Sequence, residues 1–228
     1  MSCKPDICII CIWPFYPIEV GGGARTEGTL AREGQTSPTG WGLDKFDDDG
    51  DLYVPAGHAG VLIIKGGTGP TAAHYYEYGR YHVEGGNPTA QGNVRDYPIL
   101  GLVLEENGWP TEENLHVAIR EITRRSGRGT YCHGNVDHTC GRDSYVKATD
   151  FVDNFRNDPN QHYSLSTNSC LYFSYKVNVA GEWSWFGPVP YLDMLPAANI
   201  DYRPFQNTMS YNPDGDHFDE DIWQIPGS

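Results

Sequence analysis

The sequence has no apolar run as long as the roughly 20 residues that a helix needs to cross a bilayer. Its start, "MSCKPDICIICIWPFYPIEV", sets a lysine, an aspartate and prolines around a short apolar block, and it does not resemble a cleaved signal peptide. We therefore expect a protein that is made in the cytoplasm, and any export would follow a route that uses no cleaved signal.

Basic residues are also scarce. The 16 lysines and arginines stand against 30 acidic residues, so the net charge is -14 and the isoelectric point is about 4.8. An excess of negative charge opposes binding to nucleic-acid phosphates and to an anionic lipid surface. We therefore expect neither nucleic acid nor an inserted membrane segment among the partners.

Cysteines, at six in 228 residues, are too few and too unevenly spread for a disulfide-built scaffold. The chain is 39% hydrophobic and 13% aromatic, which is enough to bury a full core. We interpret residues 1–228 as a single domain, with a loop-rich part over 1–50 and an irregular, wrapping segment over 181–228.

Two kinds of regular structure are predicted between those ends. The stretch "VPAGHAGVLIIKGGTGPTAAHYYEYGRYHV" has an apolar run, a turn cluster and an aromatic-rich run, which is the pattern of a β-hairpin. Apolar residues then recur at helical spacing, which predicts helices from Thr111 to about Gly127 and from Ser144 to about Asn157. A third helix is expected to begin near Cys170.

The stretch "STNSCLYFSY" places Cys170 at the head of that third helix. Thr167 and Asn168 are natural capping residues, so the thiol is expected in the first turn. The unpaired N–H groups and partial positive charge of a helix N-terminus favour a thiolate there. A cysteine hydrolase also needs a histidine within hydrogen-bond reach and a polar group that orients it. Taken alone, a buried cysteine is more often an inert packing residue.

His58 is the candidate base, because its small neighbours leave the ring accessible at the mouth of the strand "GVLII". If the "KGGTGP" turn centres the hairpin, the returning strand brings Glu77 roughly opposite His58, with both side chains on one face. Glu77 is therefore the candidate orienting group. Tyr75 shares its face, whereas Tyr76 and Tyr78 point the other way.

The segments "GHAGVLII…HYYEYGRY" and, later, "YSLSTNSCLYF" resemble the circularly permuted papain-like proteins, in particular the permuted NlpC-type peptidases. In that group the histidine strand comes first and the catalytic cysteine comes late, after a Y-x-L-x-x-N-x-C approach to a helix. The matching residues here are Tyr163, Leu165, Asn168 and Cys170. The resemblance implies an α+β permuted papain-like fold, in which a small antiparallel sheet packs against the helix that bears the nucleophile.

Within this group the chain is most similar to peptidoglycan-degrading effectors of bacterial type VI secretion. That similarity implies a cysteine endopeptidase or amidase, without metal or cofactor, that cleaves stem peptides in the periplasm of a target cell. Catalysis would fall to Cys170, His58 and Glu77, and substrate binding to Tyr75, Asn168 and Trp185. The implied partners are peptidoglycan, a secretion-apparatus carrier and a cognate immunity protein.

Other interpretations stay open. A lipid acyltransferase or a ubiquitin-type isopeptidase of the permuted papain-like group would use the same thiol chemistry. The lipid enzyme, however, needs a membrane-binding surface that the negative charge does not favour. From a different class, the chain would be a non-catalytic binding protein in which the thiol is merely buried.

Three weaker motifs have simpler interpretations. For "CHGNVDHTC", residues 132–140, a zinc site, a Cys132–Cys140 disulfide formed after export and a plain loop all stay open. "CIIC", at Cys8 and Cys11, has the spacing of a redox pair but lies in a β-like apolar run, which favours packing. "DKFDDDGDLYV" lacks the later glutamate of an EF-hand and is interpreted as a solvated turn.

Overall fold

The computed structural model describes residues 3–13, 16–20, 45–46, 52–55, 57–79, 92–127, 129–163, 168–183 and 208–218. A seven-stranded antiparallel sheet dominates them. Its strands, in spatial order, are β12 (His217–Phe218), β11 (Thr208–Asn212), β10 (Cys132–Thr139), β1 (Asp6–Trp13), β5 (His58–Ile64), β7 (Ala73–Gly79) and β8 (Asn93–Pro98). Two smaller sheets contain β2 (Pro17–Val20), β4 (Leu52–Pro55) and β3 (Lys45–Phe46), and β6 (Gly69–Pro70) and β9 (Val103–Leu104).

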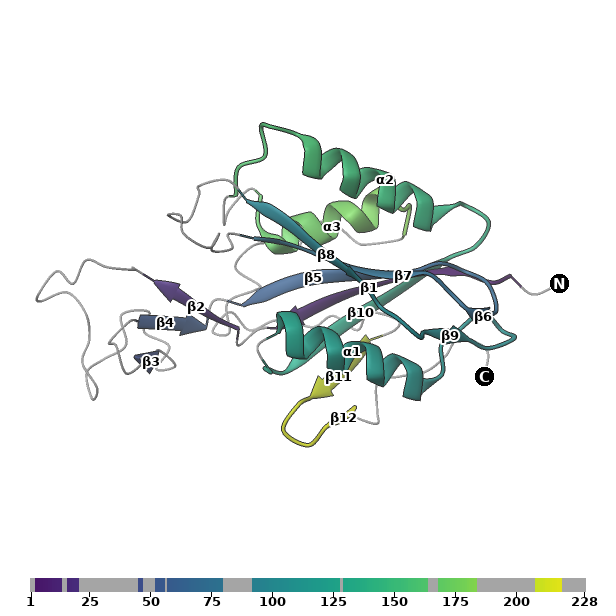
Figure 1. The fold of residues 1–228 in the computed structure, drawn as a ribbon, viewed down its shortest axis with the longest axis horizontal. Helices are drawn as coiled ribbons and strands as arrows, with labels where there is room; N and C mark the ends of the chain where they lie inside the picture. Colours follow the sequence, from purple (N-terminus) through teal and green to yellow (C-terminus); the bar gives the residue numbers. More distant parts are fainter. Residues whose placement is uncertain are drawn as a thin grey trace, which may run out of the picture.

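Helices cover both faces of the large sheet (Figure 1). α1 (Glu112–Ser126) lies on one face, and α2 (Ser144–Asn157) and α3 (Cys170–Ala180) lie on the other. Since both faces of the central strands β1 and β5 are covered, their sequences are almost continuously apolar rather than alternating. Successive residues of these strands enter two separate cores, with Ile7, Ile9, Leu62 and Ile64 in the one that holds α1 and Cys8, Ile10, Val61 and Ile63 in the one that holds α2 and α3.

α1 and α2 begin and end where the sequence predicts. The hydroxyl of Thr111 caps α1 by accepting the N–H of Asn114 at 3.1 Å, and the predicted apolar face of the helix is buried. Asp143, which precedes α2, makes no side-chain cap. The carboxylate of Asp6 takes that role instead, because its Oδ2 accepts the N–H of Tyr145 at 2.9 Å and so ties α2 to the start of β1.

The large sheet exceeds the small one predicted from the sequence, because two segments interpreted as irregular are strands. "CHGNVDHT" forms β10, which pairs with β1 on one side and β11 on the other. Its polar residues give no strand pattern in the sequence, and its place in the sheet depends on backbone hydrogen bonds to both neighbouring strands. In the described part of 181–228, β11 and β12 form a hairpin at the sheet edge, so that segment is not wholly irregular.

A disulfide joins Cys3 to Cys140, whose Cα atoms are 5.9 Å apart. The Cys132–Cys140 alternative is wrong, because an extended strand rises about 3.3 Å per residue and separates those two too far for a bridge. The remaining cysteines, Cys8, Cys11, Cys132 and Cys170, are free and buried, so the "CIIC" pair packs in the core as predicted. Among the described residues, no group of three or more histidine, cysteine, aspartate or glutamate side chains is placed to hold a metal ion.

No helix in the described part of the chain is long and apolar enough to cross a membrane. Several predictions fall outside the described residues: the loop over 21–44, the acidic turn around residues 47–51, and Trp185.

Candidate active site

Cys170 is the first residue of α3, as predicted, but the residue that caps the helix is Ser169 rather than Thr167 or Asn168. The backbone of Ser169 is extended, and its hydroxyl accepts the N–H of Tyr172 at 3.3 Å. The thiol therefore stands in the first turn, where unpaired N–H groups and the helix dipole favour a negative charge.

Asn168 fixes the approach to the helix rather than its cap. Its side-chain amide donates to Gln161 Oε1 and to the carbonyl of His162, both at 2.9 Å. These contacts attach the residue two positions before Cys170 to the turn that follows α2. They hold the approach to α3, and so the segment that leads to the thiol, against that turn.

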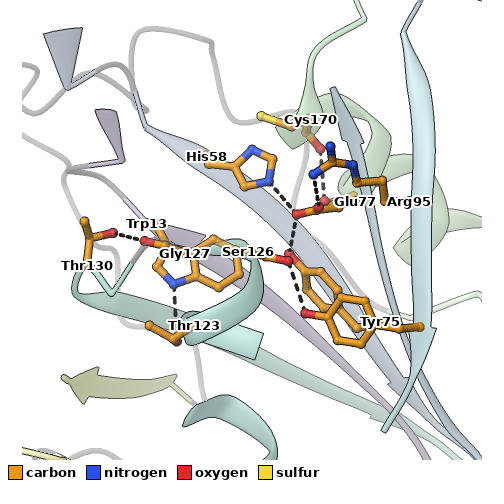
Figure 2. Close-up of polar contacts among 12 residues, drawn as sticks. Trp13, His58, Tyr75, Glu77, Arg95, Thr123, Ser126, Gly127, Thr130 and Cys170 are labelled. Carbon is orange, nitrogen blue, oxygen red and sulfur yellow. Dashed lines mark hydrogen bonds and ion pairs between the residues drawn. The ribbon is translucent and has the colours of Figure 1, made fainter. Parts of the chain in front are cut away.

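His58 and Glu77 meet as predicted, across the pair of strands β5 and β7. The register places Glu77 opposite Gly60, two residues beyond His58 on the same face of β5. His58 Nε2 lies 2.8 Å from Glu77 Oε2 (Figure 2). Gly60 has no side chain, and this leaves room for the hydroxyl of Tyr75, since a Cβ at Gly60 would overlap that hydroxyl.

Tyr75 lies on the face of Glu77, in the core that holds α1, whereas Tyr76 and Tyr78 belong to the opposite core, and this confirms the predicted orientation. The ring of Tyr75 is fully buried, and its hydroxyl donates to Glu77 Oε2 at 3.3 Å. In this structure Tyr75 therefore supports the carboxylate and is not open to a substrate.

The thiol of Cys170 approaches the His58 ring at the edge that does not face Glu77 (Figure 2). Because Nε2 faces Glu77, Nδ1 is the ring nitrogen available to the thiol. Cys170 packs against Ala59, the residue that follows His58 on β5, and only 2% of Cys170 and 7% of His58 are exposed. The thiol, the imidazole and the carboxylate thus form a continuous row that is largely shielded from solvent.

The ionisation of this row favours a charged pair. Burial raises the pKa of the Cys170 thiol, but the hydrogen bond and charge of His58, with the backbone N–H groups of Ala59 and Leu171, lower it below its ordinary value. Burial lowers the pKa of His58, and its contacts with Cys170 and Glu77 outweigh this and raise the pKa from 6.5 to about 9. Each group stabilises the charged form of the other, so the pair favours thiolate and imidazolium.

Glu77 stays ionised although it is only 3% exposed. Burial raises the pKa of the carboxyl, and the opposing contacts with His58, the hydroxyl of Ser126 and the charge of Arg95 bring it below its ordinary value. Arg95 approaches from β8, with its guanidinium 4.0 Å from Glu77 Oε1. A buried, ionised carboxylate can both orient the imidazole and stabilise its positive charge.

Two aromatic rings hold the imidazole of His58. Trp13, the last residue of β1, stacks on it with ring centres 5.9 Å apart, and Tyr16 tilts against it at 4.9 Å. The indole N–H of Trp13 donates to the hydroxyl of Thr123 on α1 at 3.3 Å. The ring is therefore fixed by contacts from β1 and, through Trp13, from α1.

Sequence reasoning missed Trp13, Tyr16, Arg95 and Ser126. They come from segments that are far apart in the chain, and none belongs to a recognisable local motif. The only signal in the sequence was Trp13 as an aromatic residue at the end of an apolar strand, which is equally typical of a core residue.

A family model described as "Type VI secretion system effector TseH-like" matches residues 8–184, which is more than half of the chain. The chain belongs to this family of type VI secretion effectors. It is also similar to the crystal structure of the type VI secretion system effector TseH, with a TM-score of 0.63 and 25% sequence identity over 96% of this chain and 98% of that one. None of the curated proteins compared with it matches.

The comparisons define the functional class. Membership of the TseH-like family indicates a secreted effector, in agreement with the type VI effector resemblance inferred from the sequence. The fold that carries the site is mixed α and β, with a mostly antiparallel sheet and, among the described residues, three helices.

Proposed function

We propose that this TseH-like effector is a cysteine endopeptidase or amidase that cleaves amide bonds in the stem peptides of peptidoglycan. The observation that supports it most is the row formed by Cys170 at a helix N-terminus, His58 and the buried carboxylate of Glu77. A thiolate paired with an oriented imidazolium is suited to acyl transfer from an amide. An effector delivered into another bacterium meets the cell wall as a large amide-containing substrate.

In the proposed reaction His58 already holds the proton that it has taken from Cys170 in the resting ion pair, and the thiolate attacks the amide carbonyl. The N–H of Cys170 at the start of α3 helps to stabilise the oxyanion that forms. As the tetrahedral intermediate collapses, the C–N bond breaks and the imidazolium of His58 gives its proton to the departing amine. A water molecule, deprotonated by His58, then attacks the thioester, and the C–S bond breaks to release the acid and to restore the thiolate of Cys170 beside the imidazolium of His58.

The finer features of the proposal follow from the same row. The order of His58, Glu77 and Cys170 in the chain and the packing of α3 on the sheet support a permuted NlpC-type papain-like fold. Asn168 and Trp185 stay candidate substrate contacts. The proposed site of action is the periplasm of a target cell, and the proposed partners are a secretion-apparatus carrier and a cognate immunity protein.

The direct test is to incubate purified peptidoglycan with the protein and to identify the released fragments by mass spectrometry. New amine and carboxyl ends within the stem peptide are expected with the wild type and are expected to be absent with Cys170→Ala. Fragments that the Cys170→Ala variant also releases would exclude thiol catalysis. Intact peptidoglycan, together with cleavage of a ubiquitin-type isopeptide substrate, would favour the isopeptidase.

A further inference from the structure

The indole of Trp13 lies directly beside the imidazole of His58. The two residues are cross-strand partners in the pairing of β1 with β5, so their side chains share the face of the sheet that α1 covers. Their ring centres are 5.9 Å apart, and their planes differ by only 20°. Trp13 is fully buried, and it therefore shields one side of the imidazole from solvent.

The indole is itself held by the end of α1. Its N–H donates to the hydroxyl of Thr123 at 3.3 Å, and both residues are buried. Gly127, which follows the helix, lies directly against the indole, where a Cβ would overlap the ring (Figure 2). The ring of Tyr75 meets the indole nearly edge-on, with 6.2 Å between the centres and 78° between the planes. Because its nitrogen is bonded and its ring is packed, the indole is held in one orientation.

The last turn of α1 is closed by the same residues that contact the indole. The hydroxyl of Thr123 accepts the indole N–H, and its carbonyl accepts the N–H of Gly127 at 2.9 Å, which ends the helix. Thr130 then donates its N–H and its hydroxyl to the carbonyl of Gly127, at 3.0 and 2.7 Å. The glycine is therefore fixed by bonds on both sides, and its lack of a side chain leaves room for the indole.

An indole in this place acts on the imidazole in two ways. Its aromatic face attracts a cation, so it favours the imidazolium over the neutral ring. It also limits rotation, since a turn of the imidazole about its Cβ–Cγ bond would move an edge of that ring toward the nearly parallel indole. The orientation that remains points Nε2 of His58 to Glu77 and leaves Nδ1 to the thiol of Cys170.

We propose that Trp13 is a positioning residue that holds the imidazole of His58 in line with the thiol, and that Thr123 fixes the indole for this role. The role rests on the proposed function, because it assigns both residues to the same thiol site. The other titratable groups around the imidazole are the thiol of Cys170 from α3, the carboxylate of Glu77 from β7 with Arg95 from β8 beside it, and the phenols of Tyr16 and Tyr75. Substitution of Trp13 or Thr123 leaves all of these groups in place, so the effect of the indole can be measured separately.

The test is the pH dependence of Cys170 alkylation by iodoacetamide in the intact protein, followed peptide by peptide with mass spectrometry. Trp13→Leu keeps an apolar side chain but removes the aromatic face, and it is expected to raise the midpoint of the profile by about one pH unit, a roughly tenfold change in the ratio of thiolate to thiol. Thr123→Val removes the hydroxyl at nearly constant volume and should shift the midpoint in the same direction by less. Thr123→Ser, which keeps the hydroxyl, should restore the wild-type profile.

The matched control is Trp183→Leu, at another buried tryptophan whose indole N–H is bonded. That indole donates to the carbonyl of Asp6 at 3.1 Å and packs in the core that holds α2 and α3. Trp183 follows the C-terminal end of α3, whereas Cys170 begins that helix. The control variant should lower the melting temperature, as the loss of any large core side chain does, without moving the alkylation profile.

An unchanged profile for Trp13→Leu, or an equal shift for Trp183→Leu, would overturn the positioning role, because Trp13 would then be an ordinary core residue. A shift in Trp13→Leu with none in Thr123→Val would overturn the part assigned to Thr123. Should Trp13→Leu fail to fold, Thr123→Val decides, and a wild-type profile for that variant would overturn the role.

These outcomes are separable from those of the proposed function. If the wild type releases peptidoglycan fragments but Trp13→Leu and Thr123→Val leave the alkylation profile unchanged, the positioning role fails and the function stands. If both variants shift the profile as expected but no fragment is released, the positioning role stands and the substrate assignment fails.

Discussion

His58 Nε2 lies 2.8 Å from Glu77 Oε2, although the strand register pairs Glu77 with Gly60. The contact forms because His58, at the start of β5, lies on the same face as Gly60, where the missing side chain leaves room for the hydroxyl of Tyr75 beside Glu77. The same position, next to Ala59, brings the ring beside the N-terminus of α3. The thiol, the imidazole and the carboxylate therefore meet where the start of β5 lies beside β7 and beside the N-terminus of α3.

Replacing Cys170 by alanine or serine is expected to abolish hydrolysis, by at least about a thousandfold, because the nucleophile is lost. The fold should survive, since the change removes or replaces one sulfur atom. Fragment release from peptidoglycan and a thermal melt measure the two effects. Cys132→Ala, at another free and buried cysteine, should keep activity. Wild-type turnover by Cys170→Ala would exclude the assignment.

His58→Ala is expected to be nearly as damaging as the loss of the thiol, whereas Glu77→Gln should retain partial activity, reduced by about 10- to 100-fold, because an orienting group contributes less than the base. The control is His74→Ala, at a residue of β7 whose ring stacks on Tyr76 at 5.9 Å, away from Glu77. An essential His74 with a dispensable His58 would contradict the proposed site.

Hydrolysis is expected to show a bell-shaped dependence on pH. As the pH falls through the lowered pKa of Cys170, the thiolate is protonated and both alkylation and hydrolysis decline. As the pH rises through about 9, the raised pKa of His58, the imidazolium needed by the departing amine disappears and hydrolysis declines again. Alkylation, which needs no acid, should not fall at high pH. A thiol that titrates near its ordinary pKa of about 8.5 would contradict the ion pair.

Reduction of the Cys3–Cys140 disulfide is expected to lower the free energy of unfolding by about 2–4 kcal/mol, because the bridge closes a very long loop. For a chain of this length the melting temperature should fall by about 5–15 °C. The Cys3→Ser variant should have the melting temperature of the reduced wild-type protein, and a reductant should no longer change it. An equal melting temperature with and without reductant would show that the bridge adds no stability.

Expression in a laboratory bacterium should be harmless when the protein stays in the cytoplasm and lytic when an added export signal sends it to the periplasm. The reason is that the proposed substrate, peptidoglycan, lies only outside the inner membrane. Culture turbidity, compared with that of Cys170→Ala carrying the same signal, measures the effect, and lysis should require both signal and thiol. Equal toxicity of the cytoplasmic form would favour an intracellular protein substrate.

Much of the local structure was determined by the sequence alone. α1 and α2 were predictable because apolar residues at helical spacing mark a buried face, and for α1 the capping residues Thr111 and Gly127 also mark the ends. Glu77 and Tyr75 could be assigned to the same face of β7 because side chains alternate along a strand, once the hairpin of β5 and β7 was recognised. His58, Glu77 and Cys170 were named on this basis, and the structure brings them together.

Only the tertiary structure decided what lies around them. β10 could not be predicted, because its residues are largely polar and it forms a strand through backbone pairing with β1 and β11. Cys140 forms a disulfide with Cys3 because β10 lies beside β1. The stacking of Trp13 on His58, with the indole bonded to Thr123, depends on where α1 meets the sheet, and the place of Arg95 beside Glu77 depends on the pairing of β8 with β7. Such contacts join residues that are distant in the chain, and local propensity and periodicity carry no information about them.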